Sequence, residues 1–269
     1  MNLVRALIFA GGTGQRMNSR SKPKQFIEIH GKPILIYTLE HFEYHEEIDD
    51  IIVVCIEEWM ERLSGFLHRF GISKVSEIVP GGPTGHDSIY NGLVALRNRA
   101  NPDDIILIHD GVRPLITDEL ITSNIKSVKE YGNSITVEPT RESVIISKDG
   151  SLALDAPPAH QMYVSKAPQS FYYKDIIEVY DKASEDGIKS IDSAHLLSIY
   201  DMPMQMVRSS KNNSSERKIF LELLNSAGNS FKNCFPHDTL NSSALSTSHD
   251  QGYIAFSQLW IIYLKLSLA

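Results

Sequence analysis

A glycine-rich loop beside a group of cations is the part of the sequence best suited to chemistry. The apolar run that ends at Ala10 is followed by three glycines within four positions: Gly11, Gly12 and Gly14. Four basic residues then surround a single proline: Arg16, Arg20, Lys22 and Lys24. Because glycine has no Cβ, the backbone N–H groups of such a loop can approach a ligand closely and surround phosphate oxygens.

Two of these cations, Arg16 and Lys24, could together neutralise the charge of a nucleoside triphosphate. The loop lacks the GK[ST] ending of a P-loop, and it fits the dinucleotide pattern GxGxxG poorly. We predict a loop that binds nucleotide phosphates. The alternative is a plain tight turn with a solvated basic flank.

A second candidate site lies in the segment HDGVRP, which follows the apolar run IILI. Asp110 offers the hard oxygen ligand that Mg²⁺ prefers, since this ion usually takes one or two carboxylates plus substrate phosphates. Arg113 could hold a phosphate through its planar guanidinium. The alternative is an Asp–Arg pair that only fixes the loop. We interpret three histidines as packed or surface residues rather than as bases: His109, His160 and His195.

The composition is that of a soluble globular protein. The chain has 269 residues, 42% of them hydrophobic and 22% charged, and its formal net charge of −7 argues against a binder of nucleic acid or of a membrane surface. Cys55 and Cys234 are the two cysteines, so a disulfide framework or a thiolate metal site is not expected. The apolar stretches ALIFA and LWIIYLKL are too short for an export signal or a membrane span. We expect a cytoplasmic protein.

The elements that must position these residues follow an alternating pattern. Residues 3–10, 51–56 and 105–110 are continuous apolar runs and predict buried strands. The segments ILIYTLEHFEY and WMERLSGFLHRF between them have apolar residues at helical spacing. This order predicts βαβ units and a parallel sheet with helices on both faces, and ligands then bind at the carboxyl ends of the strands.

The second half of the chain contains a predicted arm and a change of character. SVIISKDGSLAL consists of two extended runs joined through Asp149-Gly150, which predicts a β-hairpin that projects from the sheet, with the whole arm at about 139–166. Beyond about Arg208 the sequence becomes rich in Ser and Asn. We therefore predict one domain over residues 1–225 and a poorly ordered tail over 226–269.

The motifs together resemble the polyol-phosphate cytidylyltransferases, namely the methylerythritol-phosphate and ribitol-5-phosphate enzymes. The resemblance covers about three quarters of the chain and rests on these segments: GGTGQRM, PKQF, GKPILIYTLEHF, PGGPTGHDSIYNGL at 80–93, HDGVRPLIT at 109–117, PTRESVI at 139–145, APQSF at 167–171 and SIDSAHLL at 190–197. It implies a Rossmann-like nucleotidyltransferase fold. It also implies that the arm embraces a second subunit, so that the protein is a homodimer.

The resemblance also implies roles for individual residues. The backbone of Ala10, Gly11, Gly12 and Gly14 would surround CTP, with Arg16 and Lys24 as the catalytic cations on its phosphates. The remaining residues implied to bind CTP are Gly81, Gly82, Ser88 and Gly111, of which the first three would recognise cytosine. Arg113 and Ser143 would bind the acceptor, and Asp110 would hold Mg²⁺. PGGP could instead be only a sharp turn, and Asp192 could be structural rather than chemical.

This chain departs from the family pattern at several positions. Gly85 stands where an Arg is usual, and Ala159 stands where the arm usually carries an Arg for the acceptor phosphate. Near the end of the domain, KNNSSERKIF replaces an Asn-x-Lys-[IV]-T segment, so that Asn213 matches while Lys211 or Lys218 would have to replace its Lys. Ser143, where Thr is usual, is a milder change. These departures argue for a different polyol phosphate or an impaired enzyme.

The implied reaction is in-line attack by the acceptor's phosphate oxygen on the α-phosphorus of CTP, with release of pyrophosphate. The acceptor is already an anion, so positioning and charge neutralisation suffice and no general base is required. The product would serve a surface polymer, such as teichoic acid or capsule, or an isoprenoid precursor. Two alternatives stay open: a uridylyl or guanylyl transferase, and a nucleotide-binding paralogue without catalysis.

Overall fold

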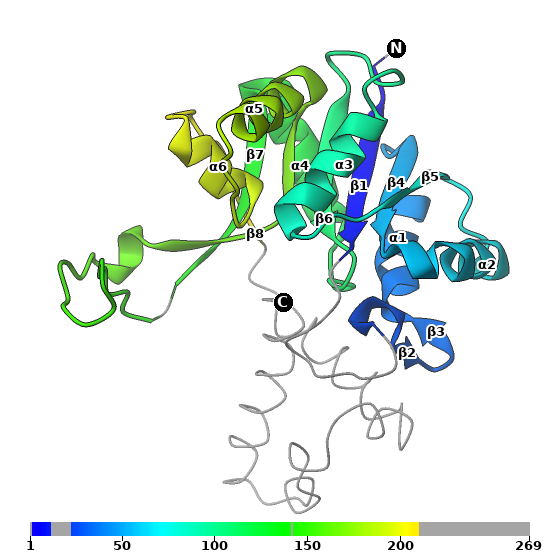
Figure 1. Ribbon diagram of the computed structural model, residues 1–269, viewed down its shortest axis with the longest axis horizontal. Coiled ribbons are helices and arrows are strands. Elements are labelled where there is room, and N and C mark those ends of the chain that lie inside the picture. Colours follow the sequence, from blue (N-terminus) through cyan, green and yellow to red (C-terminus); the bar gives the residue numbers. More distant parts are fainter. Residues whose placement is uncertain (1, 12–22, 141, 210–269) are drawn as a thin grey trace, which may run out of the picture.

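The computed structural model describes residues 2–11, 23–140 and 142–209, which build a seven-stranded sheet with helices on both faces (Figure 1). The strands of this sheet are β1 (Val4–Ala10), β4 (Asp50–Cys55), β5 (Val75–Pro80), β6 (Ile105–Asp110), β7 (Asn133–Pro139), β8 (Tyr163–Tyr172) and β9 (Met206–Arg208). Their order is β5-β4-β1-β6-β8-β7-β9. A separate antiparallel pair consists of β2 (Glu28–Ile29) and β3 (Lys32–Pro33).

The sheet is mixed and mostly parallel. Each neighbouring pair from β5 through β6 is parallel, and so is the pair of β7 and β9. Strand β8 runs antiparallel to both β6 and β7. The sheet architecture inferred from the sequence is thus confirmed, and the three strands predicted in the first half lie within a residue of their observed bounds.

Helices connect the strands. The α-helices are α1 (Ile34–Tyr44), α2 (Met60–Phe70), α3 (Gly85–Ala95), α4 (Asp118–Tyr131), α5 (Tyr173–Glu185) and α6 (Ser193–Ile199). Short 3-10 helices occur at η2 (Lys24–Phe26), η3 (Glu57–Trp59) and η4 (Ala159–Gln161). Helices α2 and α4 end at Gly71 and Gly132, whose φ angles of 69° and 90° lie in the left-handed region that favours glycine. None of the described helices combines the length and apolar character of a membrane span.

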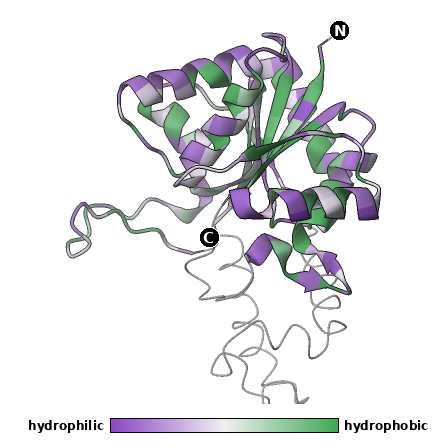
Figure 2. Ribbon diagram, turned by 45° about the vertical axis from the view of Figure 1, so that its right-hand side comes forward, coloured by the Kyte–Doolittle hydropathy of each residue, from purple (hydrophilic) through white to green (hydrophobic). Residues whose placement is uncertain are grey.

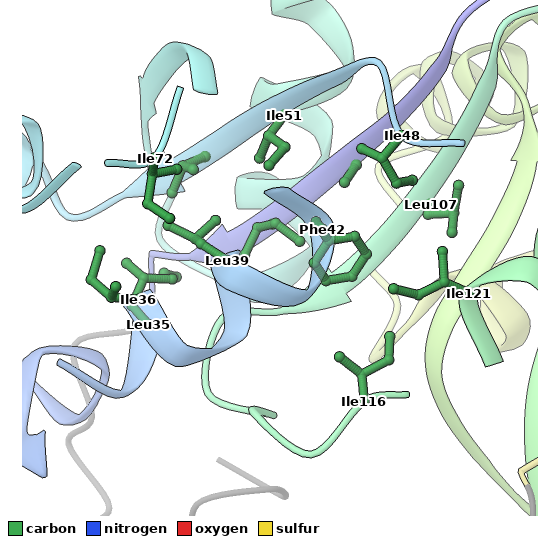
Figure 3. Packing of buried hydrophobic residues seen from close by; sticks show 14 of the residues in the cluster. Leu35, Ile36, Leu39, Phe42, Ile48, Ile51, Ile72, Leu107, Ile116 and Ile121 are labelled. Atoms are coloured by element: carbon green, nitrogen blue, oxygen red, sulfur yellow. The ribbon is translucent and has the colours of Figure 1, made fainter. Parts of the chain in front are cut away.

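Two hydrophobic cores lie on opposite faces of the sheet. Alternate residues of β1 point to opposite sides: Ile8 belongs to the core beneath α1, α2 and α4, and Leu7 belongs to the core beneath α3, α5 and α6. Figure 3 shows the first core, where Leu39 and Phe42 of α1 pack over strand residues such as Leu107. Figure 2 shows the corresponding pattern, with hydrophobic strands between helices whose outer faces are largely hydrophilic.

The arm projects from the sheet beyond β7 and returns through η4 to β8 (Figure 1). It reverses direction at Gly150, where φ is 75°, and the Asp149 carboxylate accepts hydrogen bonds from the backbone of Ser151 and Leu152 at 2.9 and 3.0 Å. These bonds lower the pKa of Asp149. The predicted pair of strands is reduced here to one bridge, between Ile146 and Asp155. A two-stranded ribbon standing alone has little to stabilise it, which is consistent with so short a ladder.

Candidate functional site

Three strand ends and two glycine motifs meet at the carboxyl edge of the parallel part of the sheet. Strands β1, β4 and β5 end there at Ala10, Cys55 and Pro80, and their registers place these residues side by side. The Gly81 N–H donates to the Cys55 carbonyl at 2.7 Å, which fixes the start of the second glycine motif against β4. Parallel sheets bind ligands at this edge, so the sequence motifs lie where a nucleotide is expected.

Gly11 and Gly81 lie too close together for side chains. A Cβ on Gly11 would stand 2.7 Å from Ser88 Oγ and 3.1 Å from the Gly81 Cα, and a Cβ on Gly81 would stand 2.9 Å from the Gly11 Cα. Such distances are shorter than ordinary van der Waals contact. The structure therefore brings the predicted phosphate loop and the predicted cytosine loop into direct contact, as two glycine backbones with the Ser88 hydroxyl between them.

The Ser88 hydroxyl holds the second glycine loop, residues 80–84, in shape. Ser88 is buried, its Oγ accepts a hydrogen bond from the Gly82 N–H at 3.1 Å, and it donates to the Thr84 carbonyl at 2.9 Å. The proton of this hydroxyl is therefore already used within the protein. Any contact with a base would use a remaining acceptor position of Ser88 Oγ or the backbone groups that it positions.

The same loop is fastened to the start of α3 by a capping box. The Asp87 N–H donates to Thr84 Oγ1 at 3.2 Å, and the Thr84 N–H donates to Asp87 Oδ2 at 3.1 Å. Lys189 adds an ion pair to Asp87 at 2.9 Å. Partial burial acts to raise the pKa of Asp87, but the bonds from Lys189 and Thr84 outweigh it and lower that pKa. Gly85, the first residue of α3, faces open space, with no heavy atom within 4 Å of the position that a Cβ would take.

Gly111 follows β6, the neighbour of β1 on the side away from β4. Its N–H donates to the Phe9 carbonyl at 3.0 Å, and its own carbonyl accepts from Thr38 Oγ1 at 3.0 Å. A Cβ at this position would stand 2.9 Å from the Ala10 Cβ and 2.8 Å from Leu35 Cδ1. Gly111 therefore lies directly beside Ala10. This closeness is needed if both residues are to bind the same nucleotide.

Asp110 and Arg113 pair with each other. Arg113 Nε donates to Asp110 Oδ2, and both side chains are about one-fifth exposed. The Asp–Arg pair, which is the alternative to a phosphate and metal site, is thus formed. It does not exclude a role in binding, because the carboxylate keeps a second oxygen, Oδ1, with no hydrogen bond to any other described residue.

His109 supports this loop from below rather than acting as a base. The ring is buried and packs against Phe42, with centroids 5.3 Å apart, and its Nε2 lies 3.2 Å from the Arg113 carbonyl. Burial lowers the pKa of His109 to about 4, so the ring is neutral at pH 7 and can donate one hydrogen bond to that carbonyl. Its role is to position the turn that carries Arg113.

Lys24 is buried, with an exposed fraction of only 6%, although lysine is ordinarily a surface residue. It begins η2, and the neighbouring Gln25 anchors this segment by donating from Nε2 to the Ala10 carbonyl at 2.5 Å. Phe26 stacks on Trp59 with ring centroids 4.5 Å apart. The burial follows from these two anchors, and the Gln25 contact is a feature of the PKQF motif that sequence reasoning missed.

Asp192 has a structural place in this region. It caps α6 by accepting from the His195 N–H at 2.8 Å, and its other oxygen accepts from Ser165 Oγ at 2.9 Å and Gln169 Nε2 at 3.0 Å. Gln169 also accepts from the Ala194 N–H at 3.0 Å. These bonds tie α6 to β8. They agree with the structural interpretation of Asp192.

Lys166 of β8 is a cation that sequence reasoning did not single out. Its side chain is about one-quarter exposed, and its Nζ lies 3.8 Å from Glu138 Oε2. Burial lowers the pKa of Lys166, and the charge of Arg113 lowers it further. The sequence around the APQ motif did not indicate a role for Lys166. The charged residues near it in space, Glu138 and Arg113, come from other parts of the chain.

The remaining predicted residues lie away from this group or outside the described part of the chain. Ser143 is exposed near the start of the arm, and Ala159 lies in η4 at its return, so that both belong to the arm rather than to the turn of Asp110 and Arg113. The following predicted residues lie outside the described residues: Gly12, Gly14, Arg16, Lys211, Asn213 and Lys218. So does the predicted domain boundary at 225.

Comparison with known proteins gives a consistent result. Residues 4–216 match the family model of 2-C-methyl-D-erythritol 4-phosphate cytidylyltransferase (IspD). A ribitol-5-phosphate cytidylyltransferase of Streptococcus agalactiae serotype III is 44% identical over 202 residues, which are 75% of this chain and 84% of that protein. A 2-C-methyl-D-erythritol 4-phosphate cytidylyltransferase of Clostridium botulinum (strain 657) is 36% identical over 207 residues, 77% of this chain and 89% of that protein.

A solved structure agrees with the fold. The 4-diphosphocytidyl-2C-methyl-D-erythritol synthase of Anaerococcus prevotii matches with a TM-score of 0.67 and 27% identity, over 79% of this chain and 89% of that chain. The motifs, the parallel sheet with its glycine loops at the carboxyl edge and these relatives lead to one conclusion. The chain belongs to the polyol-phosphate cytidylyltransferase family, whose members are CTP-dependent enzymes.

Proposed function

We propose that this enzyme transfers a cytidylyl group from CTP to ribitol 5-phosphate and releases pyrophosphate. The assignment of CTP as the nucleotide substrate rests on the contact of Gly11 with Gly81 and Ser88 at the carboxyl edge of the sheet. The choice of acceptor is supported by sequence: the ribitol-5-phosphate relative is 44% identical and the methylerythritol-phosphate relative 36%.

The chemical step needs no proton transfer. A phosphate oxygen of the acceptor attacks the α-phosphorus of CTP, a new P–O–P bond forms, and the bond from the α-phosphorus to the bridging oxygen of the β-phosphate breaks. The electron pair leaves with pyrophosphate. Because the acceptor phosphate is already ionised at neutral pH, the enzyme accelerates this step by positioning and by offsetting negative charge.

The described residues contribute to nucleotide binding, charge neutralisation and acceptor binding. Gly11, Gly81 and Gly82 let the two glycine loops pack closely against each other and against Ser88 and Asp87, which shapes the edge of the sheet where the nucleotide would bind. We infer that Lys24 contributes charge to the triphosphate from a buried position, where electrostatic interactions are screened less by water than at the surface. Arg113 contributes the planar guanidinium that suits the acceptor phosphate.

A magnesium ion fits the residues present, and we propose Asp110 as its protein ligand. Among the described residues no group of three or more His, Cys, Asp or Glu forms a cage for a metal. Mg²⁺ does not require one, because it commonly uses one or two carboxylates together with substrate phosphates. The second oxygen of Asp110 is available for this, and the bound ion would offset charge on the triphosphate.

We also propose that the protein is a homodimer built through the arm. Four large apolar side chains of the arm are between 45% and 65% exposed: Ile145, Ile146, Leu152 and Leu154. An exposed ribbon with these apolar side chains is stabilised when another surface buries them, and a second subunit would provide that surface. We place the enzyme in the cytoplasm, in keeping with the free, buried thiol of Cys55.

The proposed function is tested by incubating the purified protein with Mg²⁺, each of the four NTPs in turn and a panel of polyol phosphates, while pyrophosphate release is followed. The expected result is release with CTP and ribitol 5-phosphate above all other pairs. Release with UTP or GTP in preference to CTP would assign a different nucleotidyltransferase. Tight CTP binding without release for any acceptor would favour a paralogue that lacks catalysis.

A further inference from the structure

Lys166 and Arg113 come from distant parts of the sequence to the same end of the sheet. Strand β6 pairs with β8 in antiparallel register, with Ile108 opposite Gln169. From that pair, β6 continues toward Asp110 while the chain of β8 leads back toward Lys166. The pairing of β6 with β8 ends there, and Lys166, three residues before Gln169, lies within range of charge interactions with Asp110 and Arg113 at the carboxyl end of β6.

The ammonium group of Lys166 is poorly satisfied by the protein. About three quarters of its side chain is buried, and within the described part of the chain the carboxylate nearest to it is Glu138 at 3.8 Å, which is too far for a good hydrogen bond. An ammonium with three N–H donors that is partly withdrawn from water, with its carboxylate partner as far as 3.8 Å away, carries a desolvation cost. A ligand with several acceptor oxygens would remove that cost.

The charges around Lys166 point to an anion. Arg113 is close enough for its positive charge to disfavour the charged form of Lys166, and burial acts in the same direction. Glu138 and Asp110 act in the opposite direction. Two cations that share a partly buried site repel one another, and a phosphate dianion between them converts that repulsion into two attractions.

We propose that Lys166 binds the phosphate group of the acceptor together with Arg113. This inference rests on the proposed function, because it concerns the acceptor half of the same site. It makes Lys166 a determinant of acceptor affinity rather than of CTP binding, since the glycine loops follow β1 and β5, whereas Lys166 lies on β8, on the other side of β6. A dianionic phosphate monoester is the required chemical group.

Lys166→Met tests this directly, because methionine keeps the length of the side chain and removes the charge. Loss of one charge-assisted contact should raise the KM for ribitol 5-phosphate by about 10- to 100-fold, while the KM for CTP stays within about twofold. Lys166→Arg should restore most of the acceptor affinity. Lys129→Met is the matched control, because it removes an exposed lysine paired with Glu47 at 3.1 Å on α4.

A second variant predicts a change of the opposite sign. Glu138→Gln removes the carboxylate that competes for Lys166 and should lower the acceptor KM by about two- to fivefold. It leaves Lys166 itself intact, so the proposal stays testable even if Lys166→Met fails to fold. An unchanged acceptor KM in Lys166→Met, an equal rise in the CTP KM, or a higher acceptor KM in Glu138→Gln would overturn the proposal.

Binding of inorganic phosphate separates this inference from the proposed function. Phosphorus NMR titration of the wild-type protein with inorganic phosphate should show binding that Lys166→Met weakens and Lys129→Met does not. If the wild-type enzyme turned over none of the polyol phosphates, the proposed function would fail, and this titration would still decide the role of Lys166. Equal phosphate binding by wild type and Lys166→Met would then refute it.

Discussion

Substitution of Gly82 by Ala should damage both the stability of the fold and the affinity for CTP. The added Cβ would stand 2.3 Å from the Asp87 Cβ and 2.9 Å from the Asp87 backbone carbon. That backbone cannot retreat easily, because the capping box with Thr84 fixes the first turn of α3. The loop must move instead, by roughly 1 Å if the new contact is to reach ordinary van der Waals distance.

The cost follows from what this movement breaks. Overpacking in a tight site typically costs about 1–3 kcal/mol, and the hydrogen bond from the Gly82 N–H to Ser88 Oγ at 3.1 Å would contribute about 0.5–1.5 kcal/mol more. We therefore expect the free energy of unfolding to fall by about 1.5–4.5 kcal/mol, which lowers the Tm by about 3–18 °C in a domain of this size. A displaced loop should weaken CTP binding by about tenfold or more, equivalent to about 1.4 kcal/mol.

Gly85→Ala is the matched control, since it adds the same methyl group only three residues away. No heavy atom lies within 4 Å of its Cβ position, and its φ lies outside the left-handed region. As the first residue of α3 it should be neutral or gain up to about 1 kcal/mol of stability. Thermal melting and calorimetric titration with CTP measure both effects. If the two variants melted and bound CTP alike, the close packing of the second glycine loop would be refuted.

Three further substitutions or measurements address other parts of the structure. Lys24→Met, which keeps the buried methylenes, should lower kcat by about 100-fold or more in steady-state assays. Lys24→Ala should in addition lower the Tm, because Lys24 is buried. A normal kcat in either variant would show that Lys24 has no role in catalysis. Replacement of residues 145–154 by a short Gly-Ser linker should give a monomer in light scattering with CTP binding largely retained, whereas an intact protein that is monomeric at micromolar concentration would contradict the arm-mediated dimer. Burial raises the pKa of the Cys55 thiol to about 12. Alkylation of Cys55 between pH 7 and pH 9, measured by mass spectrometry of its peptide, should therefore be slow in the native protein and fast in urea. Rapid labelling of the native protein would contradict the burial.

The central parallel strands and the first helices could be predicted from the sequence because their signals are local. Strands β1, β4 and β6 are continuous apolar runs, since both faces of a parallel sheet are covered. The bounds of α1 coincide with the segment predicted from its apolar spacing. The same local reasoning placed the first glycine loop and Asp110 at the carboxyl ends of strands, and the structure brings Gly11 together with Gly81 and Ser88, and Ala10 together with Gly111, at that edge.

Local patterns were less informative about the environment of individual side chains. The sequence could not show that Ser88 Oγ already bonds to Gly82 and Thr84, or that Arg113 pairs with Asp110. It predicted two strands in the arm, where pairing is confined to Ile146 and Asp155. An alternating apolar pattern indicates an extended chain, but a regular ladder also requires a surface on which it can pack.

The sequence by itself determined which residue types stand at the ends of the strands, and hence the class of ligand and the family. Only the tertiary structure decided which cations share a site. Lys24 is buried because Gln25 reaches the Ala10 carbonyl and Phe26 stacks on Trp59. Lys166 lies within range of the charge of Arg113 because β8 runs antiparallel between β6 and β7. Burial and charge interactions depend on distances in space between residues far apart in the chain, and no periodicity within one segment encodes them.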